Sequence, residues 1–238
     1  MKIAIVGYGK MGQLIGQLAE EAGHTIVATI GSKNREKIAE LNPAEVDVAI
    51  EFSHPEAALQ NYATLLENGI PVVTGTTGWH DKVDVVTDMV TKANGSLFYA
   101  SNFSIGVNIV FTLNKLLAKL MEGKIDYKLK IKEIHHTTKK DAPSGTAITL
   151  AEQIIQNNTS KLDWVNEETE ESDKIPIFSE RIADAKGYHE IDYSSDVDTI
   201  QLRHNAKSRA GFAKGALLAA EWIQGKTGIF NMEDLMEQ

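Results

Sequence analysis

The stretch Lys2-Ile3-Ala4-Ile5-Val6-Gly7-Tyr8-Gly9-Lys10-Met11-Gly12 decides the fold of the first part of the chain. Residues 2–6 are typical of a buried strand, and residues 11–19 carry a helical pattern that ends near Gly23. A GxGxxG loop between a strand and a helix indicates a dinucleotide site, because its glycines permit a tight turn, backbone approach to a pyrophosphate and close helix packing. The alternative is a tight turn without a ligand.

Strand and helix patterns alternate as far as residue 100. Further strands are expected at 25–30, 46–52, 71–74 and 97–100, with helices at 55–67 and 82–93. Strands that alternate with helices form a parallel sheet covered on both faces. The sequence therefore predicts an α/β fold with a Rossmann-type parallel sheet domain.

The pattern changes after Asn102. A long helix is expected over 106–122, and residues 127–133 alternate strictly between polar and apolar, as a strand of an antiparallel sheet does. Strand patterns at 175–181, 188–193 and 199–204 follow a polar, acidic segment at 157–173 that predicts a surface loop, and a final helix is expected over 208–224. We therefore expect an inserted α+β domain with an open, mostly antiparallel sheet over 104–209. Residues 1–103 and 210–238 would form the dinucleotide-binding domain.

Composition excludes several classes of protein. The chain has 238 residues, 42% of them hydrophobic and 24% charged, which is ordinary for a globular protein. No apolar run is long enough to cross a membrane, and the N-terminus shows no signal-peptide pattern, so we expect a cytoplasmic protein. The absence of cysteine excludes disulfides and cysteine-ligated metals. A net charge of -9 argues against nucleic-acid binding, so an anionic ligand needs a local basic site.

The segment after the second strand bears on the choice of dinucleotide. Ile30 is followed by Gly31-Ser32-Lys33-Asn34-Arg35, without the acidic residue that often binds the adenosine ribose. Lys33 and Arg35 could attract a 2′-phosphate, so we expect NADPH to be used at least as well as NADH. The alternative is that both are solvated loop charges.

Small residues follow two later strands, as Gly75-Thr76-Thr77-Gly78 and Ala100-Ser101-Asn102-Phe103-Ser104. Open α/β sheets bind ligands at the carboxyl ends of their strands, and small residues there would let a nicotinamide approach the backbone. Taken alone, both stretches could simply be turns.

The stretch Glu133-Ile134-His135-His136-Thr137-Thr138-Lys139-Lys140-Asp141-Ala142-Pro143-Ser144-Gly145-Thr146 gathers imidazoles, ammonium groups and a helix start. Period-two alternation places Glu133 and His135 on the apolar face of their strand. Free N–H groups at Ser144, Gly145 and Thr146, together with Lys139, would hold a substrate carboxylate. No metal site is expected, because His135 and His136 point to opposite faces, and no GxSxG hydrolase motif is present.

At these residues the chain resembles the 4-hydroxy-tetrahydrodipicolinate reductases (dihydrodipicolinate reductases) of bacterial lysine and diaminopimelate biosynthesis. The similarity is carried by residues 7–12, 75–78, 100–108, 133–147 and 204–216, of which the 133–147 signature is the most specific. It implies reduction of a small dicarboxylate substrate with NADPH or NADH and loss of water. It also implies that residues 104–209 bind the substrate and assemble a homotetramer. Gly31 departs from the many members that have an acidic residue there.

The resemblance also assigns site residues. It implies His135 and Lys139 as catalytic residues and His136, Gly145 and Thr146 as substrate contacts, beside Ser144 from the expected anion site. The expected cofactor contacts are Gly7, Tyr8, Gly9, Lys10, Met11, Gly12, Lys33, Gly75, Thr76, Thr77, Ala100, Ser101, Asn102 and Phe103.

Hydride addition to a conjugated C=N would place negative charge on nitrogen, and we expect His135 and Lys139 to quench it together. Two alternatives remain open at this stage. One is a related imine reductase or amino-acid dehydrogenase, and the other is a non-catalytic NAD(P) sensor, which would need neither side chain. Fold alone does not separate these functions.

Overall fold

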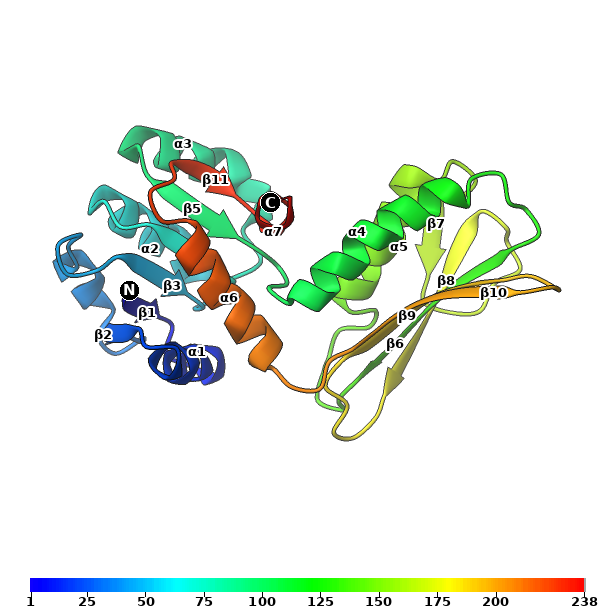
Figure 1. Cartoon of the computed structure of the whole chain (residues 1–238), viewed down its shortest axis with the longest axis horizontal. Coiled ribbons are helices and arrows are strands. Elements are labelled where there is room, and N and C mark those ends of the chain that lie inside the picture. Colours follow the sequence, from blue (N-terminus) through cyan, green and yellow to red (C-terminus); the bar gives the residue numbers. More distant parts are fainter. Residues whose placement is uncertain (238) are drawn as a thin grey trace. The chain divides into compact units, whose positions relative to one another are not determined.

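The computed structural model describes residues 1–237, which form two compact units (Figure 1). Unit 1 contains Met1–Ile105 together with Ala210–Gln238, of which Gln238 lies outside the described residues, and unit 2 contains Gly106–Arg209. No helix within residues 1–237 has the length and apolar character that a membrane crossing requires.

Unit 1 is built on a parallel sheet of six strands, in the order β11-β5-β4-β3-β1-β2. The expected Rossmann-type parallel sheet is confirmed. Because β2 lies on one side of β1 and β3 on the other, the order in which strands are added reverses between β1 and β3, and this is where such sheets bind ligands. The strands are β1 Lys2–Val6, β2 Thr25–Ile30, β3 Val48–Glu51, β4 Val72–Thr74, β5 Ser96–Tyr99 and β11 Gly228–Phe230.

Helices cover both faces of this sheet. Alternate side chains of β1 enter different cores: Ile3 and Ile5 pack with helices α1 and α6, whereas Ala4 and Val6 pack with α2 and α3. The helices are α1 Lys10–Glu21, α2 Pro55–Glu67, α3 Val83–Ala93, α6 Ala210–Trp222 and α7 Met232–Met236, with short 3-10 helices η1 Arg35–Glu40 and η2 His80–Lys82. Two elements near the end of the chain, β11 and α7, were not predicted. β11 extends the sheet by pairing in parallel with β5.

Unit 2 holds a five-stranded sheet in the order β10-β9-β6-β8-β7. β10 with β9 and β9 with β6 are antiparallel pairs, whereas β6 with β8 and β8 with β7 are parallel pairs, so the sheet is mixed rather than mostly antiparallel. Helix α5 connects β6 to the β7–β8 region, and a helical crossover is what allows two strands to run parallel. The strands are β6 Lys128–His135, β7 Asp163–Val165, β8 Lys174–Arg181, β9 Tyr188–Ser194 and β10 Thr199–Asn205.

Two helices, α4 Ile105–Leu120 and α5 Gly145–Asn157, supply the apolar side chains that cover one face of this sheet. Leu129 and Ile131 of β6 are buried there, while Lys128 and Lys130 are exposed on the other face. The short strand β7 lies inside the segment 157–173, which the acidic composition had indicated as loop alone.

Candidate active site

The three glycines of the 7–12 loop have different steric surroundings. Gly7 has φ +95°, and a Cβ atom on it would stand 2.0 Å from the carbonyl oxygen of Phe52, which follows β3. A Cβ on Gly12 would stand 2.2 Å from the carbonyl oxygen of Gly7, whereas a Cβ on Gly9 would meet no atom within 4 Å. The first and third glycines therefore pack the loop against its neighbours. Gly9 alone of the three opens onto free space, where a pyrophosphate would need the backbone bare.

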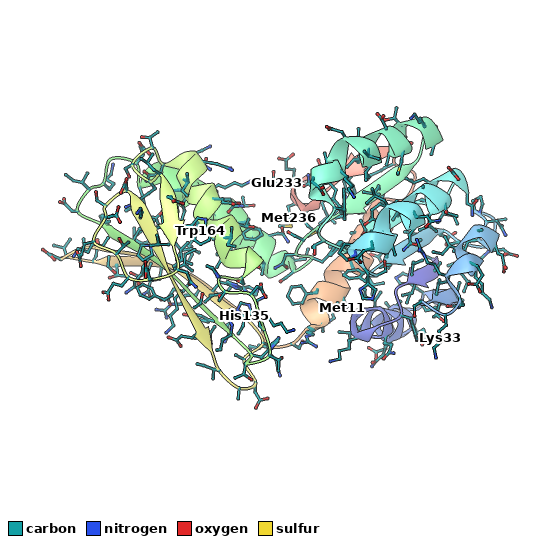
Figure 2. The ribbon with its side chains drawn as sticks, turned by 180° about the vertical axis from the view of Figure 1, so that it is seen from behind. Met11, Lys33, His135, Trp164, Glu233 and Met236 are labelled. Atoms are coloured by element: carbon teal, nitrogen blue, oxygen red, sulfur yellow. The ribbon has the colours of Figure 1, made fainter. Side chains whose placement is uncertain are left out.

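The N-terminus of α1 suits an anion. Gly9 is its N-cap and offers no side-chain cap, and the first turn holds no acidic residue. A helix start of this kind presents N–H groups and a positive dipole end to a phosphate. Tyr8 and Lys10 are exposed beside it, and Met11 is partly buried against the core (Figure 2). The residues present fit a dinucleotide.

The loop after β4 is held by its own polar groups. The Thr76 hydroxyl accepts a hydrogen bond from the Ser53 N–H at 2.9 Å, and the Thr76 N–H donates to the Thr74 hydroxyl at 3.1 Å. Gly75 has no room for a side chain, because its Cβ would stand 2.1 Å from the Phe52 ring. Thr76 therefore shapes the loop, while Thr77 is exposed.

The loop after β5 mixes core and surface residues. Ser101 is exposed, and the Asn102 side chain accepts a hydrogen bond from the Ser104 N–H at 2.9 Å. Phe103 is 2% exposed and packs its ring near Phe98 and Phe52, so its side chain belongs to the core. Any cofactor contact at Phe103 would have to use its backbone.

A buried carboxylate that sequence reasoning missed joins the ends of β3 and β4. Glu51 is fully buried; it accepts hydrogen bonds from the Thr74 hydroxyl at 2.8 Å, from the Asn61 amide at 3.2 Å and from the Ser53 hydroxyl. Burial, followed by the charge of Glu51, raises the pKa of Tyr62, whose hydroxyl lies 2.8 Å from that of Thr74. The available signal was an acidic residue at the end of an apolar strand. This network fixes the loops after β3 and β4 relative to each other.

The two cations after β2 differ in their surroundings. Lys33 is exposed in unit 1 (Figure 2), whereas Arg35 donates hydrogen bonds to the Asn61 side chain at 3.0 Å and to the Ala57 carbonyl oxygen at 3.1 Å. Arg35 is therefore tied to α2 through its guanidinium. Of the two cations, Lys33 is the one whose side chain is exposed to meet a phosphate.

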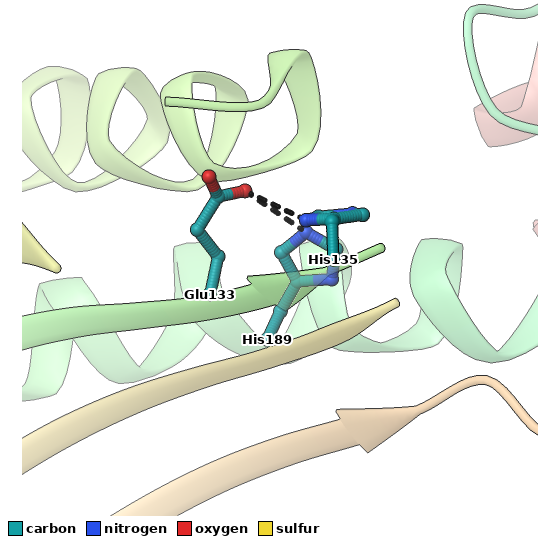
Figure 3. Close-up of side chains that lie close together, drawn as sticks. All are labelled: Glu133, His135 and His189. Atoms are coloured by element: carbon teal, nitrogen blue, oxygen red, sulfur yellow. Dashed lines mark ion pairs between the residues drawn. The ribbon is translucent and has the colours of Figure 1, made fainter. Parts of the chain in front are cut away.

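In unit 2, the imidazoles of His135 and His189 lie beside the same oxygen of the Glu133 carboxylate (Figure 3). Glu133 Oε2 lies 3.1 Å from His135 Nδ1 and 4.0 Å from His189 Nε2. Glu133 is fully buried and the His135 side chain is 12% exposed. The shorter contact is at ion-pair distance, but the ring N–H does not point at the oxygen closely enough to make a hydrogen bond. Because a ring torsion of this kind is broad, a small rotation of the imidazole costs little and would align its N–H with the oxygen.

The charge state of this cluster follows from its contacts. Burial would raise the pKa of Glu133, but the His135 imidazole at ion-pair distance, together with Ser144, Ser179 and Arg181, outweighs burial and holds the pKa far below its usual range. Burial, followed by the charge of His135, lowers the pKa of His189 to about 3. At neutral pH the site therefore holds a carboxylate beside a neutral His189 imidazole.

The N-terminus of α5 differs from the expectation at Ser144. The Ser144 N–H is not free, because it donates to both oxygens of Glu133 at 3.1 Å. The Ser144 hydroxyl caps the helix by accepting from the Ala147 N–H at 3.3 Å, and Ser144 is 2% exposed. The expectation of a free N–H at Ser144 is wrong, because an ionised carboxylate already occupies that donor. Gly145 is exposed, with no atom within 4 Å of the place where its Cβ would be, and Thr146 is half-buried.

Lys139 and His136 complete the group. Lys139 Nζ lies 2.8 Å from Asp141 Oδ2, and this hydrogen bond lowers the pKa of Asp141. His136 Nδ1 lies 2.7 Å from the Thr138 hydroxyl. Desolvation, followed by the positive charge of Arg209, lowers the pKa of His136. The charges of His135 and Lys139 lower this pKa further. The structure thus brings His135, His136 and Lys139 within electrostatic reach of one another.

The same cluster has the donor set of a metal site. Ligand atoms of Glu133, His135 and His189 all lie within 4.8 Å of one another. Arg181 Nη2, however, also lies 3.1 Å from Glu133 Oε1, and a fixed guanidinium charge beside the carboxylate opposes a bound cation. The geometry favours a hydrogen-bonded cluster over a metal centre.

Comparison with known proteins gives a consistent result. Residues 1–103 match the family model described as dihydrodipicolinate reductase, N-terminus, and residues 106–236 match the model described as dihydrodipicolinate reductase, C-terminus. A protein of Christiangramia forsetii named 4-hydroxy-tetrahydrodipicolinate reductase is 46% identical over 99% of this chain and 98% of its own length. A protein of the same name from Akkermansia muciniphila is 35% identical over 96% of this chain and 94% of its own.

Solved structures share the fold. A dihydrodipicolinate reductase from Paenisporosarcina sp. TG-14, with dipicolinate bound, superposes with a TM-score of 0.70 at 24% identity over 97% of each chain. An aspartate semialdehyde dehydrogenase II from Vibrio cholerae has a TM-score of 0.54 at 11% identity, over 93% of this chain and 97% of its own. The same architecture thus accompanies different names, so the fold by itself does not identify the reaction.

Proposed function

The chain belongs to the dihydrodipicolinate reductase family, and from this we infer that it is an oxidoreductase that reduces 4-hydroxy-tetrahydrodipicolinate to tetrahydrodipicolinate, with loss of water. The family acts in lysine and diaminopimelate biosynthesis and uses NAD(P)H. The match extends over the full length of the relatives, so the inference applies to the chain as a whole.

One observation in the site supports this function above the others. The imidazole of His135 and the start of helix α5 contact the same buried carboxylate, Glu133, so a proton donor and a helix N-terminus are fixed at one place. A helix start attracts a carboxylate, and an imidazole can donate a proton to a substrate oriented by it. A protein that only sensed NAD(P) would have no need of this pairing.

We assign the following roles to the residues of unit 2. Hydride addition to the conjugated C=N leaves negative charge on the ring nitrogen; His135 donates a proton toward it and Lys139 stabilises the charge. Gly145 and Thr146, at the start of α5, bind a substrate carboxylate together with His136. Ser144 supports this site by capping α5 and does not offer its own N–H.

Unit 1 would hold the dinucleotide. Its nicotinamide, when bound, supplies the hydride. Gly9 and the start of α1 bind the pyrophosphate, with Gly7, Tyr8, Lys10, Met11 and Gly12 forming the loop. Gly75, Thr76 and Thr77, and the backbone of residues 100–103, line the nicotinamide end. Lys33 would bind a 2′-phosphate, so we propose that NADPH is used at least as well as NADH.

The test is a coupled assay with the purified protein. The upstream synthase generates the unstable substrate, and oxidation of NADPH or NADH is followed by loss of absorbance. We expect oxidation that depends on both enzymes and ceases when the synthase is omitted. If the purified, folded protein oxidises neither cofactor under these conditions, the proposed function fails. The cytoplasmic location and the homotetramer stay predictions, which fractionation and light scattering would check.

A further inference from the structure

Glu133 is a buried charge to which no step of the proposed reaction gives a role. We propose that Glu133 is the positioning residue for His135: its carboxylate holds the imidazole with Nδ1 protonated and facing Glu133, and so leaves Nε2 for the substrate. The inference rests on the proposed reductase function and deepens it, because it says which ring nitrogen serves the reaction and what selects that nitrogen.

The strand sets up the contact. Glu133 and His135 are two residues apart on β6, so their side chains leave the same face of the sheet. The result is the 3.1 Å separation between Glu133 Oε2 and His135 Nδ1, with Glu133 fully buried and His135 only slightly exposed (Figure 3). Solvent therefore screens this pair little.

The charge of Glu133 then fixes the tautomer. The contacts of Glu133 keep its pKa far below the usual range despite its burial, so at neutral pH the side chain accepts hydrogen bonds and donates none. An imidazole nitrogen 3.1 Å from such an acceptor is most stable when it carries the proton, because a lone pair there would be repelled and a small ring rotation completes the hydrogen bond. In the neutral ring of His135 this leaves Nε2 with the lone pair, and in the charged ring it leaves Nε2 with the proton to give.

The surroundings of Nε2 agree with this assignment. The nearest atom to a Cβ built on Gly187 would be His135 Nε2, at 3.5 Å. Gly187 has φ +135°, a backbone conformation that glycine adopts readily and L-residues rarely do. Position 187 therefore carries no side chain beside the nitrogen that is to meet the substrate.

Glu133 is itself held from two other elements. Arg181, the last residue of β8, places Nη2 3.1 Å from Oε1, and the Ser144 N–H at the start of α5 lies 3.1 Å from each oxygen. Arg181 also donates to the carbonyl oxygen of Asp141. One carboxylate thus links β6, β8 and the start of α5, so it orients the imidazole relative to the helix end that binds the substrate carboxylate.

The first measurement needs no variant of Glu133. Nitrogen NMR of the imidazoles in histidine-labelled wild-type protein distinguishes the two neutral tautomers and the charged ring, and His135→Gln identifies the resonances of His135. Spectra recorded at a pH high enough to remove the proton that Nε2 gives should show the neutral ring with its remaining proton on Nδ1. Finding the Nε2-protonated form instead would overturn the proposal.

The second measurement is kinetic. Glu133→Gln keeps the shape and an acceptor for Arg181 but removes the charge that selects Nδ1–H. We expect kcat to fall by about 10²-fold or more, with the KM for NADPH within about 3-fold of wild type, because only the proton donor is disturbed. The matched control is Glu180→Gln, which removes a carboxylate from β8 that pairs with Lys132 at 2.7 Å. This control should keep wild-type kcat.

The outcomes separate the two proposals. Wild-type protein without turnover would overturn the proposed function. Active wild-type protein whose Glu133→Gln variant folds, keeps wild-type kcat and shows an unchanged His135 tautomer would overturn the positioning role alone. A loss of kcat with an unchanged tautomer would overturn it as well, since the charge of Glu133 would then not be what selects the tautomer. If Glu133→Gln does not fold, the wild-type NMR measurement still decides.

Discussion

Arg35 donates a hydrogen bond from Nε to the side-chain oxygen of Asn61 at 3.0 Å, and the amide of Asn61 in turn donates to the buried carboxylate of Glu51 at 3.2 Å. The guanidinium after β2 is thereby connected to the network that fixes the loops after β3 and β4. Sequence alone treated Arg35 and Lys33 as equivalent cations. The structure gives them different surroundings, and this leads to a test of cofactor preference.

We expect Lys33→Ala to lower kcat/KM for NADPH by about 3- to 10-fold and to leave the value for NADH nearly unchanged. Lys33 is exposed, so its attraction to a 2′-phosphate is weakened by solvent and worth about 1 kcal/mol. Steady-state kinetics with both cofactors measures the ratio. An unchanged ratio in Lys33→Ala would remove the argument that this residue favours NADPH.

Arg35→Gln should behave differently. It removes hydrogen bonds to Asn61 and Ala57, so we expect a loss of about 1–3 kcal/mol in the free energy of unfolding. Denaturant unfolding of this variant and of Lys33→Ala, which should retain wild-type stability, makes the comparison. Equal stabilities of the two variants would contradict the structural role of Arg35.

The glycine loop gives a second pair of contrasting variants. Gly9→Ala has open space for its methyl group and an extended backbone that alanine tolerates, so we expect near wild-type stability but dinucleotide binding weakened about 10-fold or more. Gly12→Ala would place its methyl 2.2 Å from the Gly7 carbonyl oxygen, and we expect it to destabilise unit 1 by several kcal/mol. Thermal unfolding and NADPH titration check both. Tight NADPH binding by Gly9→Ala would show that the pyrophosphate does not approach this residue.

His135→Gln should lower kcat by about 10²- to 10⁴-fold, because glutamine cannot donate a proton as an acid does. NADPH binding, measured by titration, should stay at its wild-type strength, since the dinucleotide loop lies in unit 1. A fully active His135→Gln enzyme would refute the assignment of this residue as the proton donor.

Lys139→Ala should also lower kcat sharply, because it removes the charge that stabilises the developing anion. Its neighbour provides the control: Asp141→Asn removes the partner that Lys139 contacts at 2.8 Å but keeps the amine. We expect Asp141→Asn to retain most of the activity. Equal losses in Lys139→Ala and Asp141→Asn would show that the ion pair, not the amine, is what matters.

Stability should depend on pH through His189. Burial lowers its pKa in the folded protein from 6.5 to about 3, so between these values the unfolded chain binds the extra proton. The stabilising effect is complete above pH 6.5 and is lost as the pH falls toward 3, by at most about 1.4 kcal/mol per pH unit. The lowered pKa values of His204 and His136 act in the same direction.

Thermal unfolding between pH 7.5 and 5 (about the range accessible before carboxylates titrate) measures this dependence. His189→Leu should flatten the decline in Tm on acidification, whereas His54→Gln, at an exposed histidine, should not. Identical slopes in wild type and His189→Leu would show that His189 does not remain neutral in the folded protein.

Sequence patterns predicted the fold class but not all of the contacts within the candidate site. The alternation of Ile3 and Ile5 with Ala4 and Val6 reflects burial on both faces, which periodicity reports directly. The short strands β7 and β11 show no recognisable strand pattern in the sequence, and the strands with which they pair decide their structure. The direction of β8 relative to β6 likewise depends on the crossover through α5, although the helix itself was expected.

In the candidate site, too, local sequence patterns predicted some features and tertiary contacts decided others. Alternation placed Glu133 and His135 on one face of β6, as the structure has them. That the carboxylate reaches back to the Ser144 N–H, and that Glu51 joins two loops, depends on tertiary contacts between segments distant in sequence. A helix start in sequence therefore indicates where an anion can bind, but not whether a side chain of the protein is already bound there.

The discontinuity of unit 1 has a consequence for synthesis on the ribosome. Its sheet gains the edge strand β11, and its core gains the buried alanines of α6, only from the segment that follows residue 209. Unit 2 has all of its strands before that point and can fold while it emerges. Residues 1–105 thus emerge before unit 2 and wait, with an exposed sheet edge, for the segment from residue 210 onward, and this is the interval in which a chaperone would matter most.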